Sequence, residues 1–68
     1  MQITQSRLVS ETDAAKYLGV SVGWLRFHRY NIGRFETAVA PPHVKLGRLV
    51  RYDLDDLARW VEEHKIVA

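Results

Sequence analysis

The sequence contains no cysteine, so neither disulfide bonds nor thiolate metal ligands stabilise the fold. No apolar run approaches the roughly 18 residues of a membrane span, and the first ten residues lack the apolar region of a signal peptide. We therefore expect a cytoplasmic protein without membrane association. At 68 residues the chain is long enough for a single domain, 1–68, and we expect its ordered core over about 8–65.

Groups that could perform catalysis or hold a cofactor are also scarce. His28, His43 and His64 are widely spaced, and neither a cysteine nor a close carboxylate pair accompanies them to complete a metal site. The acidic cluster at 53–56 is typical of a helix cap and a first helical turn. A phosphate-binding loop and a nucleophile–base pair are both missing. We expect no enzymatic activity, no metal and no cofactor.

The positive charge lies in one segment of the chain. Residues 26–51 contain six basic side chains and one acidic side chain, whereas the remainder contains four basic and seven acidic ones. The two parts therefore have charges of +5 and −3, which give the net charge of +2. This asymmetry indicates a directional positive surface for a polyanion such as double-stranded DNA.

The first half of the chain predicts two short helices joined by a tight turn. Ser10 is suited to cap the first helix and Gly19 to end it in a left-handed conformation. Ser21 is the next N-cap, so the second helix is expected from Val22 to about Tyr30. A capped helix, a glycine turn and a capped basic helix are typical of the motif that presents its second helix to the major groove.

Residues 43–52 alternate in a way that predicts a β-hairpin. The expected inner face comprises Val44, Leu46, Val50 and Tyr52. This register requires a three-residue loop at 47–49 and places Lys45 directly opposite Arg51. Because directly opposed like charges are destabilising, the register predicts that an anion lies against this outer face.

The end of the chain predicts a third helix capped by Asp53. The spacing of Leu54, Leu57 and Trp60 gives it an apolar face that closes the core. The connection over 31–42 contains Ala-Pro-Pro and is expected to be irregular.

The order of these elements resembles the small winged helix-turn-helix proteins of the excisionase and AlpA type, which are related to the DNA-binding domain of MerR regulators. The resemblance covers Leu8 to about Lys65 and rests on AAKYLGVS, KLGRLVRY and DLDDLARW in that order and spacing. It implies an α+β winged helix-turn-helix fold, with three short helices and a two-stranded β-hairpin wing. Three features depart from the family: Trp24 replaces a small hydroxyl residue, His28 replaces a larger apolar one, and the 31–42 connection is longer.

In that family the second helix enters the major groove and the wing lies along the backbone or the minor groove. The expected contacts on the recognition helix are Ser21, Gly23, Trp24, Arg26, Phe27 and Arg29. Those on the wing are Lys45, Arg48 and Arg51. Arg26 is suited to contact either a guanine base or a phosphate, and Arg29 is suited to contact a phosphate. Arg48 at the wing tip is suited to enter a narrow minor groove.

Several of these residues have ordinary structural interpretations as well. Trp24 and Phe27 are spaced to pack in a core, or one of them is exposed to DNA or a protein. Gly23 either allows close approach to DNA or is a tolerated weak helix former. The basic residues of the hairpin can also protect an edge strand from aggregation.

The resemblance implies a recombination directionality factor that binds and bends DNA to assist an integrase or recombinase, with cooperative self-association on DNA as a further expectation. We favour this role because no effector domain accompanies the domain in these 68 residues. The close alternative is a small transcription regulator of a mobile element or phage. An alternative of another class is a protein-interaction adaptor that uses Trp24, Phe27 and Leu49 without binding DNA.

Overall fold

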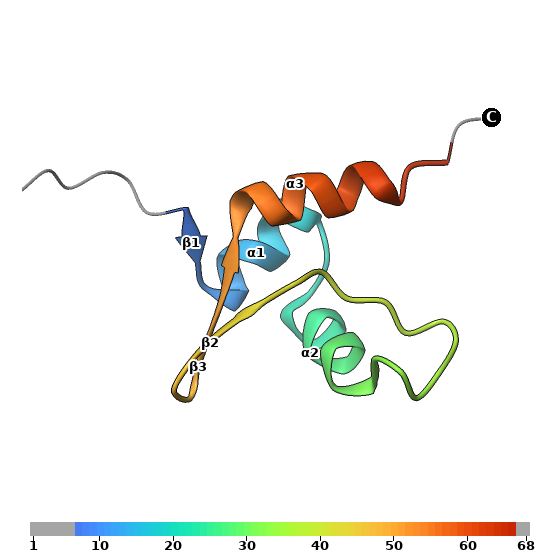
Figure 1. Ribbon diagram of the computed structural model, residues 1–68, viewed down its shortest axis with the longest axis horizontal. Helices are drawn as coiled ribbons and strands as arrows, with labels where there is room; N and C mark the ends of the chain where they lie inside the picture. The colour runs from blue at the N-terminus through green and yellow to red at the C-terminus, as the bar shows by residue number, and fades with distance from the viewer. Residues whose placement is uncertain (1–6, 67–68) are drawn as a thin grey trace, which may run out of the picture.

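Three helices pack around a three-stranded antiparallel sheet in the computed structural model, which describes residues 7–66 (Figure 1). The elements are β1 (Leu8–Val9), α1 (Glu11–Leu18), α2 (Val22–Asn31), β2 (Val44–Leu46), β3 (Leu49–Asp53) and α3 (Leu54–Glu63). This confirms the expected α+β class and the order of two helices, a hairpin and a third helix. Within the described residues, none of the helices has the length and apolar character needed to cross a membrane.

Local capping signals determine both ends of α1. The Ser10 hydroxyl accepts a hydrogen bond from the backbone N–H of Asp13 at 3.2 Å. Gly19 ends the helix with φ at 73°, a left-handed conformation that glycine adopts without steric cost. The N–H of Val20 then donates to the carbonyl of Ala15 at 3.0 Å, which satisfies a terminal acceptor. The predicted boundaries of this helix are confirmed.

A second cap starts α2 immediately after this turn. The Ser21 hydroxyl accepts the backbone N–H of Trp24 at 3.0 Å, as predicted. The helix continues to Asn31, one residue beyond the expected end. There the Asn31 side-chain amide donates to the carbonyl of Phe27 at 2.7 Å, so a helix carbonyl gains a partner.

The sheet contains one more strand than the two-stranded wing that was expected. β3 is central and pairs with β2 on one side and with β1 on the other. On the β1 side, Leu8 pairs with Asp53 and Val9 with Tyr52. A strand of two residues has no readable alternation, so β1 could not be found from the sequence pattern.

The predicted register of the hairpin is wrong by one residue. Leu46 pairs with Leu49, so the loop contains only Gly47 and Arg48. Gly47 has φ at 64° and Arg48 does not have a positive φ, the arrangement of a type II′ turn with glycine at its first central position. Two-residue turns of this type match the right-handed twist of the flanking strands.

When the pairing shifts by one residue, each side chain of one strand lies on the same face as a different set of side chains of the other strand. Lys45 lies opposite Val50, and Arg51 lies opposite Val44. The two basic residues are therefore on different faces of the hairpin, and the expected like-charge pair does not form. Leu46, expected on the inner face, is half exposed.

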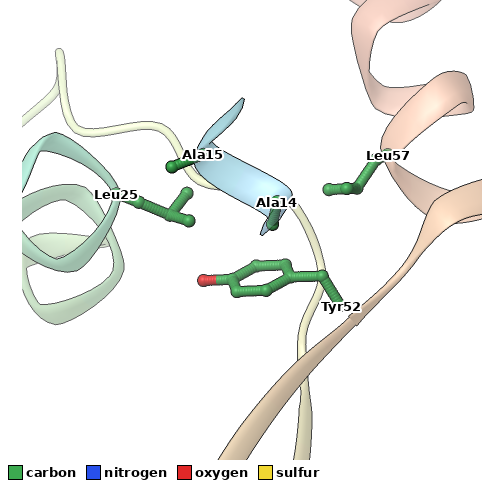
Figure 2. Close-up of a cluster of buried hydrophobic side chains, with 5 residues drawn as sticks. All are labelled: Ala14, Ala15, Leu25, Tyr52 and Leu57. Atoms are coloured by element: carbon green, nitrogen blue, oxygen red, sulfur yellow. The ribbon is translucent and has the colours of Figure 1, made fainter. Parts of the chain in front are cut away.

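The core lies where α1 meets α2, β3 and α3. Figure 2 shows Ala14 and Ala15 of α1 between Leu25 of α2 and Leu57 of α3, with the ring of Tyr52 beside them. All five side chains are buried, and the two alanines allow the neighbouring elements to approach closely. Burial of each large apolar side chain stabilises the fold by about 2 kcal/mol. Leu25 thereby fixes which side of α2 faces outward.

Candidate nucleic-acid interface

The exposed side of α2 is formed by residues opposite its buried anchor, Leu25. Gly23, Arg26 and Phe27 are exposed there, with the N-cap Ser21 at the start of the helix. The Ser21 hydroxyl already caps the helix. The structure therefore brings four of the six expected helix residues together on one accessible surface.

Trp24 and Phe27, the two aromatic residues of α2 that were expected at the interface, have different environments. Phe27 is 54% exposed, whereas Trp24 is half-buried and packs against the core. The Trp24 ring lies 4.0 Å from the ring of His28, centroid to centroid. Of these two residues only Phe27 is exposed, as is Tyr30 near the end of the same helix. Trp24 is not on the exposed side where the resemblance placed it.

Arg29 lies inside the fold, although it was expected to contact a phosphate. Its side chain is only 8% exposed and donates to Glu11 at 2.7 Å and to the hydroxyl of Tyr52 at 3.0 Å. Burial lowers the pKa of Arg29, but the hydrogen bonds to Glu11 and the tyrosines outweigh it and leave the pKa well above its usual value. Arg29 joins α2 to α1 and β3, so its guanidinium is not available for the phosphate contact that was expected.

Glu11 accepts hydrogen bonds from both arginines of α2. Arg26 reaches it at 3.3 Å but is 55% exposed, so this second pair is worth less than about 1 kcal/mol. Burial raises the pKa of Glu11, and the hydrogen bonds and charges of Arg29 and Arg26 lower it further than burial raises it. Arg26 can therefore leave Glu11 for another anion at small cost, whereas Arg29 cannot.

The cations without an acidic partner are concentrated elsewhere. Among residues 7–66, five of the ten lysines and arginines form ion pairs, and the other five form none. The five without a pair are Lys16, Arg34, Lys45, Arg48 and Arg51. Four of these lie within residues 34–51, so the hairpin and the connection before it carry the charge that is available to an anion.

The hairpin presents these cations in three directions. Arg48 is exposed in the turn, Lys45 is exposed on the face of Val50, and Arg51 lies on the other face, where it donates to the backbone carbonyl of its neighbour at 2.9 Å. At the base of the hairpin, burial lowers the pKa of His43, and the charges of Arg29 and Lys45 lower it further.

No protein-family model and no curated protein matches the sequence. The geometry of α2 and the hairpin is therefore the basis on which this surface is a candidate interface. In the part of the chain that the structure describes, no three His, Cys, Asp or Glu residues gather in an arrangement that would hold a metal ion.

Sequence reasoning missed two residues that shape this surface. Glu11 was assigned no role, yet it fixes Arg29 and holds Arg26. Arg34 was counted in the basic segment but not assigned to the interface. Glu11 stands 18 residues from Arg29, and neither its pattern nor its spacing indicates that the fold joins them.

A substitution at Gly23 tests whether this glycine is needed for close approach to DNA or is only a tolerated weak helix former. A Cβ atom at this position would meet only the Ser21 hydroxyl oxygen at 3.8 Å, an ordinary contact. We therefore expect Gly23→Ala to raise the free energy of unfolding by about 0.5–1 kcal/mol, because alanine is the better helix former. If Gly23 allows close approach to DNA, the same variant binds duplex DNA less tightly. Urea denaturation measures the change in stability, and fluorescence anisotropy measures the change in DNA affinity. An unchanged DNA affinity would contradict the idea that Gly23 allows close approach to DNA.

Proposed function

We propose that this protein is a winged helix-turn-helix protein that binds double-stranded DNA. In this proposal α2 enters the major groove with Gly23, Arg26 and Phe27, and the β2–β3 hairpin lies along the flanking backbone or minor groove. One observation carries this proposal. Within the described part of the chain, the β2–β3 hairpin has three cations without an ion pair, Lys45, Arg48 and Arg51, and it lies beside α2, a capped helix with one exposed side.

The hairpin geometry supports a contact with the minor groove. The type II′ turn leaves Arg48 at the tip, exposed and without an ion pair among the described residues. A guanidinium at such a tip suits the strongly negative potential of a narrow minor groove. Leu46 and Leu49, paired beside the turn and half exposed, can contact the sugar walls of the groove.

Within this function we propose an excisionase-like role, in which the protein bends DNA to assist an integrase. The family resemblance supports this role, and the alternative is a small transcription regulator. An excision assay with the cognate integrase, run beside a reporter on the protein's own promoter, separates the two. Stimulated excision supports the first role, whereas promoter control without any effect on excision supports the second.

Arg26 provides the test of base recognition by α2. We expect Arg26→Ala to weaken binding to the gene's own upstream duplex by about tenfold, because one arginine–base contact contributes about 1–3 kcal/mol. Binding to a random-sequence duplex should fall less. Fluorescence anisotropy gives both affinities.

Arg59→Ala is the matched control for this substitution. Arg59 lies on α3, is 66% exposed and pairs with Asp56, much as Arg26 pairs with Glu11. Equal losses for Arg26→Ala and Arg59→Ala, or no binding of the wild type to either duplex at low salt, would overturn the proposed function.

A further inference from the structure

The connection between α2 and β2 contains a structured turn at residues 32–37. The N–H of Arg34 donates to the carbonyl of Asn31 at 2.8 Å, and the N–H of Ala38 donates to the carbonyl of Phe35 at 3.1 Å. A β-bridge joins Ile32 to Phe35. Gly33 adopts φ at 84°, which permits the reversal of the chain. The expected irregular connection therefore has a defined local shape.

Side chains and backbone beyond this turn hold it against α2. The backbone N–H of Val39 donates to Nδ1 of His28 at 3.1 Å. Ala38 and Pro41 are both buried. The turn thus leaves α2 directly at its first residue and is held against α2 just after its last, which lowers the conformational entropy of its backbone that is lost on binding a partner.

The turn extends the exposed surface of α2. The Phe35 ring is parallel to that of Phe27, with an interplanar angle of 5° and centroids 6.5 Å apart. Phe27 belongs to the exposed side of α2, so Phe35 continues that side. In Figure 1 the hairpin, drawn in yellow to orange, lies on one side of α2, and the connection, drawn in green to yellow, extends on the other side.

The chemistry of the turn suits a DNA backbone. Arg34 is exposed and is one of the five cations without an ion pair in residues 7–66. Phe35 beside it is 53% exposed. A cation for the phosphate and an apolar ring for the adjoining sugar stand together on a fixed turn, next to the helix that faces DNA.

We propose that residues 32–37 form a second DNA contact, on the side of α2 opposite the hairpin. Arg34 binds a phosphate, and Phe35 together with Phe27 covers the neighbouring sugar. This inference rests on the proposed function, because it extends the same interface. α2 then lies between two backbone contacts, which fix its orientation in the groove.

Salt titrations of DNA binding test the contact. Each phosphate contact contributes a slope of about −0.9 to the logarithm of affinity against the logarithm of salt concentration. We expect Arg34→Gln to make the slope less negative by about 0.9 and to weaken the affinity roughly fivefold at 0.1 M salt. Lys16→Gln is the matched control: it removes an unpaired exposed cation from α1, and it should leave the slope unchanged. Glu36→Gln removes the acid beside the contact and should strengthen binding.

Hydroxyl-radical footprints locate the contact on the duplex. Arg34→Gln should remove protection at one end of the footprint, and Lys45→Gln should remove it at the other end. If the wild type binds with a salt-dependent affinity but Arg34→Gln keeps the wild-type slope and footprint, the second contact is refuted while DNA binding stands. In that case Arg34 and Phe35 do not contact DNA. If the wild type binds no DNA, the proposed function itself fails.

Discussion

Glu11→Ala should lower the free energy of unfolding by about 2 kcal/mol, because it leaves the largely covered guanidinium of Arg29 without its counter-charge. The Arg29 side chain is 8% exposed and would keep its hydrogen bond to the Tyr52 hydroxyl and its contact with the Tyr30 ring, but neither partner carries a negative charge. A domain of this size has a total stability of about 5 kcal/mol, so the loss is a large part of it. Urea denaturation followed by circular dichroism measures the difference.

Asp13→Ala is the matched control for this prediction. Asp13 lies in the same first turn of α1, is exposed and has no ion pair among the described residues, so its removal should change stability by less than about 0.5 kcal/mol. Combining Glu11→Ala with Arg29→Met should recover much of the loss, because an apolar side chain needs no counter-charge. Equal stabilities of the Glu11→Ala and Asp13→Ala variants would contradict the structural role of the pair.

The same pair predicts a dependence on pH. The pKa of Glu11 is lower in the folded protein than its usual value of 4.5. Its contribution is therefore fully present above pH 4.5 and is lost as the pH falls through the lower folded pKa. The stability difference between the wild type and Glu11→Ala should shrink as the pH is lowered below 4.5.

Removing the three cations of the hairpin should have the largest effect on DNA binding. The combined variant Lys45→Gln, Arg48→Gln and Arg51→Gln should reduce the salt slope by up to about 2.7 and the affinity roughly a hundredfold or more at 0.1 M salt. Two of the three side chains are exposed, and none forms an ion pair in residues 7–66, so folding should be little affected. Anisotropy titrations at several salt concentrations give both quantities.

A control variant with the same change in net charge separates a local contact from a general charge effect. Lys16→Gln, Arg59→Gln and Lys65→Gln together also remove three positive charges, all from α1, α3 and the chain just after α3. These residues lie outside the proposed interface, so the slope should remain close to that of the wild type. If both triple variants lose the same affinity, the hairpin does not form a specific contact.

Local signals in the sequence predicted the elements well. Ser10, Ser21 and Asp53 each cap a helix, and Gly19 ends one, because capping depends on residues within one turn of the chain. The hairpin was also located correctly. Its register was not predicted correctly, because the expected pairing of Leu46 with Val50 and the observed pairing with Leu49 both bring apolar side chains opposite each other. The positive φ of Gly47 decided between them, and a pattern of polarity does not contain it.

Contacts between distant residues account for the differences in the candidate site. Arg29 and Arg26 have the same charge and lie on the same helix, so their spacing suggested similar roles. Only the fold shows that Glu11 and Tyr52 surround Arg29, while Arg26 remains exposed. Similarly, the sequence left Phe27 either packed or exposed, and the fold shows that it is 54% exposed, with the Phe35 ring stacked beside it.

The most direct test of the proposed interface is a map of backbone amide chemical shifts during titration with a random-sequence duplex at low salt. The proposal predicts that the largest shifts occur at 21–27, at 32–37 and in the hairpin, while α3 changes little. Shifts concentrated on α3, or no shifts at concentrations of DNA well above that of the protein, would contradict DNA binding by this surface.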